Sequence, residues 1–239
     1  MTPKFAESMC KYFRQKSIML NNNNTIIITT TIPNNEISEK RRNNLVDNFS
    51  KYDISILLNN GIVNKNIPSH QIMFTIIKNA LEIFKKTNFE YAIICDDDFN
   101  PINNFLEELN KTLDLLPDNW RCIHLCPGYL WGRCFRDETK IGILNPEYDM
   151  NGIPFHKSGR FYINCDKNIY TYKRFWLGGP IAFVINKNNV DSLLNDFILK
   201  YKINQHNNDV ILTQILNDND YICREPLLGF ENEQGGTTF

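Results

Sequence analysis

The 239-residue sequence contains no apolar run close to the roughly 18 to 20 residues that a membrane-spanning helix needs. It also contains no excess of charge, since 26 Lys and Arg are matched by 27 Asp and Glu. Without a global basic field, the chain offers no general attraction for nucleic acid or for an anionic membrane. Charged residues interrupt the first 20 positions, so these do not form the apolar core of a signal peptide. We therefore expect a cytoplasmic protein with no membrane span and no nucleic-acid partner.

The seven cysteines include no Cys-x-x-Cys pair. Cys122, Cys126 and Cys134 lie near His124, but their spacing does not match a standard zinc site. An odd number of cysteines in a chain without a secretion signal is typical of reduced thiols in a cytosolic protein. We predict free and mostly buried cysteines.

Asparagine, isoleucine and lysine are conspicuously frequent. Their codons are rich in A and T, so the composition suggests an A+T-rich genome, such as that of a large DNA virus or a parasite. This bias concerns the origin of the chain and carries no information about its function.

Strand-like and helix-like segments alternate along the chain. Runs of β-branched or apolar residues predict strands near 25–31, 53–58, 91–95, 121–126, 181–185 and 221–223. Periodic apolar residues predict helices between several of them, most clearly over 69–86. Ser38 is predicted to cap the first helix of this pattern, and Asn100 with Pro101 to begin another. The alternation predicts an α/β fold with an open sheet flanked by helices.

A low-complexity segment, Asn21 to Asn24, interrupts the beginning of the chain. We divide the sequence into an N-terminal helix with this Asn-rich linker, residues 1–24, and a single domain, residues 25–239. A domain of this length can bury a complete core.

Three consecutive carboxylates, Asp96, Asp97 and Asp98, directly follow the predicted strand 91–95. Adjacent like charges repel one another, so such a triplet is tolerated where water or a cation compensates it. Mg²⁺ and Mn²⁺ prefer carboxylate oxygens and often join one or two of them to substrate phosphates. If the strand continues, Asp96 and Asp98 point to one side and Asp97 to the other. The triplet is either such a cation site or an ordinary acidic turn.

Ligands of open α/β sheets bind beyond the carboxyl ends of the strands. Thr29, Thr30 and Thr31 end the first predicted strand, so we expect them at the same edge as the acidic triplet.

The alternating pattern stops between Pro127 and Leu177, where aromatic and cationic residues are dense. A structureless connection of this length is improbable, so we expect hairpins. Aromatic rings and guanidinium groups suit sugars and phosphates, which favours a cleft wall; an irregular elaboration with its own small core is an equal alternative. Trp176, beside Gly178 and Gly179, is predicted to contact the sugar in the first case.

The order of these motifs resembles metal-dependent glycosyltransferases of the GT-A fold that use nucleotide sugars. The front half is similar to the lipooligosaccharide and collagen galactosyltransferase-type family (family 25-like), and the later Gly-Gly and Asp-Val segments are similar to Fringe-like β-1,3-glycosyltransferases. The residues that carry the likeness, all between Thr25 and Phe239, are Arg41-Arg42, Ser69-His70, Asp96-Asp97-Asp98, Gly178-Gly179-Pro180, Asn208-Asp209-Val210, Pro226-Leu227-Leu228 and Gln234-Gly235-Gly236-Thr237-Thr238. The chain departs from the pattern in three places: Asp96 stands where Glu is frequent, Asn208 replaces an acid, and no His follows His206.

The resemblance implies a GT-A domain with a mixed sheet, acting as a hexosyltransferase. It implies transfer from a nucleotide-diphosphate sugar, most simply a UDP-sugar, to a glycan or protein acceptor. Asp96 and Asp98 would hold Mn²⁺ or Mg²⁺, where positive charge stabilises the departing diphosphate. The donor contacts implied are Thr29, Thr30, Thr31, Arg41, Asp97, Trp176, Gly178 and Gly179.

An inverting transfer also needs a base for the acceptor hydroxyl. Asp209 fits this role by its place in the motif order; a plain helix cap is the competing interpretation.

Two other classes are alternatives. A haloacid-dehalogenase-like phosphatase also places Asp-x-Asp after an apolar strand, but Asn100 stands where such enzymes usually have Thr or Val. An inactive carbohydrate- or nucleotide-binding module could use the aromatic residues without needing the triplet. A nucleotidyltransferase would need a Gly-rich loop after the first strand, and residues 29–35 contain no Gly.

Overall fold

The computed structural model describes residues 18–61, 64, 66–125, 161–164, 169–173, 182–205, 211, 212, 215, 217, 219–223 and 227–230. The predicted N-terminal helix lies outside these residues, as do Trp176, Gly178, Gly179 and Asp209. Within the described residues, no helix is both long enough and apolar enough to cross a membrane.

The fold is built on one mixed eight-stranded sheet with the order β2-β1-β3-β8-β5-β9-β7-β6. The neighbours β2, β1 and β3 are parallel, β8 runs antiparallel to both β3 and β5, and β9 is parallel to β5. In chain order the strands are β1 Thr25–Thr31, β2 Ser55–Asn60, β3 Tyr91–Asp96, β5 Cys122–His124, β6 Phe161–Asn164, β7 Ile169–Lys173, β8 Ala182–Asn186 and β9 Asp220–Cys223. A separate two-stranded sheet pairs β4 Phe99–Pro101 with β10 Leu228–Phe230.

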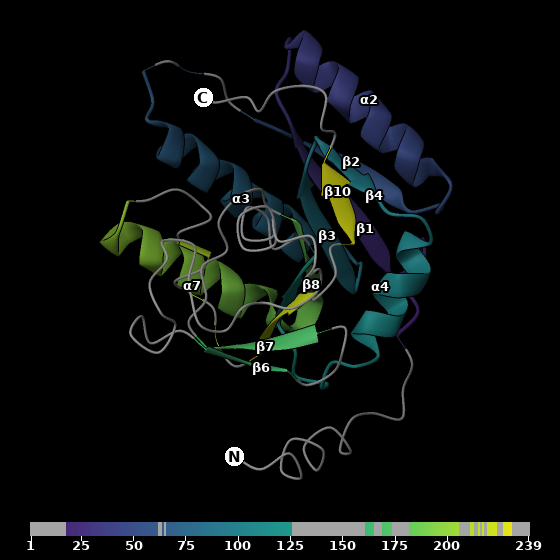
Figure 1. Ribbon diagram of the computed structural model, residues 1–239. Coiled ribbons are helices and arrows are strands. Elements are labelled where there is room, and N and C mark those ends of the chain that lie inside the picture. Colours follow the sequence, from purple (N-terminus) through teal and green to yellow (C-terminus); the bar gives the residue numbers. More distant parts are fainter. Residues whose placement is uncertain are drawn as a thin grey trace, which may run out of the picture.

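Helices cover both faces of the sheet, as Figure 1 shows. On one side lie α2, Glu36–Ser50, and α4, Phe105–Leu113; on the other lie α3, Ser69–Lys86, and α7, Val190–Ile203, which follows the short 3-10 helix η2, Lys187–Asn189. Each side has its own buried apolar cluster. The predicted class, an α/β fold with an open mixed sheet flanked by helices, is therefore confirmed.

Burial on both faces explains why the central strands are apolar almost without interruption. Ile27 and Ile93 contribute to the cluster under α2 and α4, whereas Ile26, Ile28 and Ile94 contribute to the cluster under α3 and α7. Alternate residues of β1 and β3 thus belong to opposite cores. Because helices cover both faces of the central strands, polar side chains are concentrated at the ends of these strands.

Two predicted helix starts are wrong. The N-cap of α2 is Asn35, whose side chain accepts a hydrogen bond from the Ser38 backbone N–H, so Ser38 lies inside the first turn. Asn100 and Pro101 belong to β4, and α4 begins only after Asn104. The reason for the second error is tertiary: β4 pairs with β10, a partner far away in the sequence that local residue types cannot reveal.

The expected hairpin within 127–177 is present. β6 and β7 pair antiparallel, with Phe161 opposite Lys173, and β7 adds this pair to the main sheet beside β9. Its expected role as a cleft wall stays a prediction.

The segment before β1 is fixed against α4. Ile18 and Leu20 are buried, and their backbone N–H groups donate to Asp114 Oδ1 at 2.7 Å and Asn110 Oδ1 at 2.9 Å. The proposed boundary at residue 24 stays a prediction.

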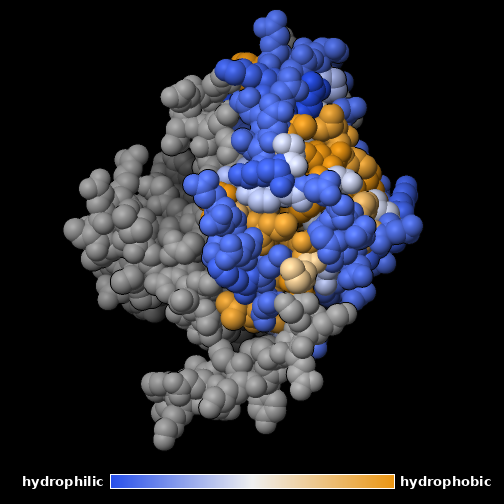
Figure 2. Space-filling model, turned by 90° about the vertical axis from the view of Figure 1, so that its right-hand side faces the viewer, coloured by the Kyte–Doolittle hydropathy of each residue, from blue (hydrophilic) through white to orange (hydrophobic). Residues whose placement is uncertain are grey.

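Figure 2 shows the side of the molecule that carries α2 and α4. Hydrophilic residues dominate the described surface, with apolar residues gathered between them. The exposed large apolar side chains of α2 are Ile37 and Val46.

Candidate functional site

The carboxyl ends of β1 and β3 meet at one edge of the sheet. The two strands are parallel neighbours, and their register places Thr29 opposite Cys95 and Thr30 opposite Asp96. The expectation that the threonines and the acidic triplet share an edge is therefore confirmed. This is the edge at which open α/β sheets bind ligands.

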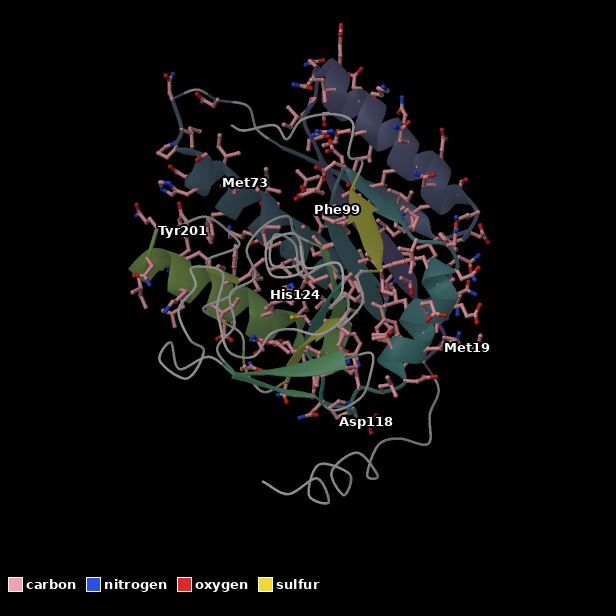
Figure 3. The ribbon with its side chains drawn as sticks, viewed as in Figure 1. Met19, Met73, Phe99, Asp118, His124 and Tyr201 are labelled. Carbon is pink, nitrogen blue, oxygen red and sulfur yellow. The ribbon has the colours of Figure 1, made fainter. Side chains whose placement is uncertain are left out.

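The acidic triplet occupies a turn between two anchored strands. Asp96 is the last residue of β3, Asp97 and Asp98 form the turn, and Phe99 begins β4. Phe99 is fully buried and pairs with Phe230, and Figure 3 shows it beside β10. The extended geometry considered for the triplet ends at Asp96, so a turn and not a strand sets the directions of Asp97 and Asp98.

Asp97 is held by the helix that follows β1. The hydroxyl of Ser38 in α2 donates a short hydrogen bond to Asp97 Oδ2. The same Ser38 oxygen accepts from the Ile32 backbone N–H at 2.8 Å and lies 3.2 Å from Thr31 Oγ1. Asp97 is thereby connected to the end of β1 and to the start of α2.

The charge of Asp97 is stabilised only in part. Burial raises the pKa of the Asp97 carboxyl, and the neighbouring Asp98 charge raises it further. The Ser38 hydrogen bond and the positive charge of Arg41 act in the opposite direction and lower this pKa. Arg41 lies in α2, three residues after Ser38, and only 4% of it is exposed.

Asp96 and Asp98 are half-buried, and the Oδ1 atom of Asp98 is itself buried. Among the described residues, no group of three His, Cys, Asp or Glu side chains is arranged to hold a metal ion. Two carboxylates fit a hard divalent cation that takes its remaining ligands from water and substrate phosphates, which is the usual mode for Mg²⁺. The donor set therefore suits a cation shared with a phosphorylated ligand better than a permanent structural metal.

Cys95 lies directly before the triplet, but its thiol is unreactive. Burial, followed by the charge of Asp96, raises the pKa of the Cys95 thiol well above its usual range. A protonated, buried thiol is neither a good nucleophile nor a metal ligand. Cys95, Cys122 and Cys223 are all buried and free, as predicted for the cysteines.

His124 ends β5 on the face of the sheet that α3 and α7 cover. It pairs with Phe183, which in turn pairs with Ile94, two residues before Asp96. Burial lowers the pKa of His124 to about 4, and its ring lies against that of Phe183 with centroids 5.5 Å apart. Figure 3 shows His124 near the centre of the molecule. An imidazole that is buried and packed against an aromatic ring in this way is a core residue.

The remaining predicted residues, Trp176, Gly178, Gly179 and Asp209, lie outside the described residues. The strand that follows the glycines is described: β8 begins at Ala182, whose partner in β3 is Cys95. The first residue of β8 thus lies at the same edge of the sheet as the triplet.

Ser38 is the site residue that sequence reasoning missed. Its identity alone carried no signal, because Ser near a helix start is read as a cap. The contact with Asp97 joins residues 59 positions apart. Only the position of α2 beside the ends of β1 and β3 brings the two side chains together.

No protein-family model matches this sequence, and no curated protein matches it. Among solved structures, the chain is similar to a glycosyltransferase involved in the glycosylation of the major capsid of PBCV-1, with 12% sequence identity and a TM-score of 0.41. The matched region covers 74% of this chain and 66% of that one, slightly less than two thirds of its length.

Proposed function

We propose that this protein is a metal-dependent glycosyltransferase. It moves a hexose from a nucleotide-diphosphate sugar, a UDP-sugar in the simplest case, to a glycan or protein acceptor. Mn²⁺ or Mg²⁺ is held by Asp96 and Asp98.

One observation carries the proposal: three consecutive carboxylates end the central strand β3 and form the turn after it, beside the carboxyl end of β1. Three adjacent negative charges at an enclosed strand end repel one another. The side chain of one of them, Asp97, is hydrogen-bonded to Ser38 of α2. The other two remain at the edge of the sheet where a ligand binds, and they match the oxygen ligands that a divalent cation shares with a diphosphate.

Each group has a defined task in this reaction. A divalent cation at Asp96 and Asp98 supplies positive charge where the diphosphate leaves. Thr30, opposite Asp96, borders the donor, the buried Thr31 supports the end of β1 through its contact with Ser38, and Arg41 supplies a buried positive charge beside Asp97. Trp176, Gly178 and Gly179 contact the donor sugar in this proposal, and Asp209 takes the proton of the acceptor hydroxyl with inversion at the sugar. These last four roles depend on the motif order alone.

The proposal is tested by measuring nucleotide release across a panel of sugar nucleotides with Mn²⁺. We expect release from at least one of them, increased by a suitable acceptor and abolished by chelation of the metal. Asp98→Ala should abolish this release and Asp96→Ala should weaken it, while Asp47→Ala serves as control because Asp47 is exposed on α2.

Thermal unfolding gives a readout that does not require the right acceptor. A ligand that binds only the folded state raises its stability. UDP with Mn²⁺ should therefore raise the melting temperature of the wild type and of Asp47→Ala but not of Asp98→Ala.

Phosphate release from simple phosphomonoesters, without any nucleotide-sugar turnover, would favour the phosphatase alternative and reject the transferase. Undiminished activity of Asp98→Ala would reject the cation site.

A further inference from the structure

We propose that Ser38 is a positioning residue that holds Asp97 against α2 and so fixes the turn from which Asp96 and Asp98 reach the cation. This inference depends on the proposed function, because it assigns a role within the same cation site. It gives Asp97 a different task from its two neighbours: Asp97 anchors the turn, and Asp96 and Asp98 bind.

The Ser38 hydroxyl has no spare hydrogen-bonding capacity. A serine hydroxyl has one proton to donate and two lone pairs that accept. The proton goes to Asp97 Oδ2, and one lone pair accepts from the Ile32 backbone N–H. Since that single proton is used, Thr31 Oγ1 must be the donor in the 3.2 Å contact with Ser38. One buried oxygen therefore joins three separate groups.

These three groups belong to the segments that border the site. Thr31 ends β1, Ile32 begins the connection to α2, and Asp97 lies in the turn that follows β3. The helix is itself fixed here, because the Ser38 backbone N–H donates to Asn35 Oδ1 at 3.0 Å. Ser38 thus sets the distance between the turn and the end of the neighbouring strand.

Three contacts support the turn from different sides. On one side the pairing of Asp96 with Thr30 fixes the last residue of β3, and on the other side the pairing of Phe99 with Phe230 fixes the first residue of β4. The third is the side chain of Asp97, which lies between them. Without this tether the turn loses the side-chain contact that joins it to α2, and the positions of the neighbouring Asp96 and Asp98 carboxylates are less closely fixed.

Burial makes the tether specific for a hydroxyl. Ser38 is only 4% exposed, so water cannot replace a lost hydrogen bond to Asp97. Residues that orient metal ligands without touching the metal typically change metal affinity 10- to 100-fold when they are removed. Ser38→Thr keeps the hydroxyl, Ser38→Cys replaces the oxygen with a larger sulfur that is a much weaker donor, and Ser38→Ala removes the group.

The experiment measures the Mn²⁺ dissociation constant of each variant without nucleotide, from the electron paramagnetic resonance signal of free Mn²⁺. The free energy of unfolding of the same variants is measured in urea without metal. Ser50→Ala is the matched control, because Ser50 lies exposed on the same helix and its hydroxyl donates only to the Asp47 carbonyl. We expect Ser38→Ala to weaken Mn²⁺ binding by about 10- to 100-fold and Ser50→Ala to leave it unchanged.

A double-mutant cycle tests whether Ser38 acts through Asp97. In an Asp97→Ala background, Ser38→Ala should change the Mn²⁺ affinity by less than about twofold, because its partner is already absent. Ser38→Thr should restore binding to within about threefold of the wild type. If Ser38→Ala does not fold, Ser38→Cys replaces it and should still weaken binding by at least about fivefold.

Each outcome is decisive. A folded Ser38→Ala or Ser38→Cys protein with wild-type Mn²⁺ affinity overturns the inference, even if its unfolding free energy is lower, because Ser38 would then be purely structural. If Asp98→Ala also abolishes binding in that case, the proposed function stands without this inference. If the wild type binds no Mn²⁺ with or without UDP, the cation site itself is rejected, and the positioning role with it.

Discussion

Arg121 and Asp220 form a two-pronged ion pair in the protein interior. Arg121 Nε donates to Asp220 Oδ1 at 2.8 Å and Arg121 Nη2 to Asp220 Oδ2 at 2.5 Å, with exposures of only 2% and 0%. The guanidinium also donates to the Ile215 carbonyl and to Asp196 in α7. Arg121 directly precedes β5 and Asp220 begins β9, so the pair fixes the sheet at the edge opposite the acidic triplet.

Replacing Asp220 with Ala should destabilise the protein strongly. The substitution leaves the Arg121 charge buried, with the partly exposed Asp196 as its remaining counterion among the described residues. Breaking a buried pair in this way typically costs about 3 to 5 kcal/mol. The measurement is urea unfolding at neutral pH. Asp191→Ala is the control: it removes the exposed partner of Lys85 and should cost less than about 1 kcal/mol. Equal losses of unfolding free energy in the two variants would show that the buried pair stabilises the protein no more than the exposed pair does.

His124 should make the protein sensitive to mild acid. Its folded-state pKa of about 4 lies below the ordinary value of 6.5, because burial disfavours the charged imidazolium. The unfolded chain therefore binds a proton that the folded chain does not, so the stability from the neutral imidazole is complete above about pH 6.5 and is lost as pH falls toward 4. Between pH 7 and pH 5 this amounts to about 2 kcal/mol.

The check on His124 is the difference in unfolding free energy between pH 7 and pH 5. In His124→Gln this difference should be about 2 kcal/mol smaller than in the wild type. An unaltered difference in His124→Gln would mean that the imidazole has the same pKa in the folded and the unfolded chain.

Lys187 caps the C-terminal end of α3. Its ammonium donates to three backbone carbonyls, those of Phe84 at 2.5 Å and of Lys85 and Thr87 at 2.8 Å, and it lies 4.7 Å from the centre of the Phe84 ring. A cation is favourable at a helix C-terminus, where carbonyls lack helical partners. Lys187→Met should reduce the unfolding free energy by about 1 to 3 kcal/mol in urea. Lys202→Met, at an exposed position of α7, should have no comparable effect.

Asp209→Asn separates catalysis from helix capping. Asn keeps the size and most of the capping ability of Asp but cannot remove a proton. We expect normal UDP–Mn²⁺ binding and melting temperature, with sugar transfer slowed by roughly 10²-fold or more. Transfer near the wild-type rate, or a product that keeps the donor's anomeric configuration, would exclude Asp209 as the base.

The parts of the fold with strong local signals were predictable. The strand Thr25–Thr31 and the helix Ser69–Lys86 have the predicted bounds. A strand that is buried on both faces gives a continuous apolar and β-branched run, and a helix that is buried on one face gives apolar residues at helical spacing. The common edge of Thr30 and Asp96 followed from parallel strands and a single rule of α/β sheets.

What could not be predicted depends on long-range contacts. Asn100 and Pro101 resemble a helix start, but pairing with β10 makes them a strand. Ser38 resembles a cap, but a carboxylate 59 residues away uses its hydroxyl. His124, Arg121 and Asp220 each have residue types that suggest chemistry, and only their burial shows that they belong to the interior. For such residues the environment, and not the residue type, decides the role.

The antiparallel direction of β8 determines where the segment between β5 and β8 begins and ends. Because β8 runs against β3 and β5, the chain leaves β5 and re-enters β8 at neighbouring points: the Leu125 N–H donates to the Ala182 carbonyl at 2.9 Å. Everything inserted between them begins and ends beside the acidic turn, and the outermost strands β6 and β7 come from that insertion. Closing a loop of different length costs little when its ends are already adjacent. An insertion of a different length at this point can therefore be accommodated without changing the order of the six inner strands.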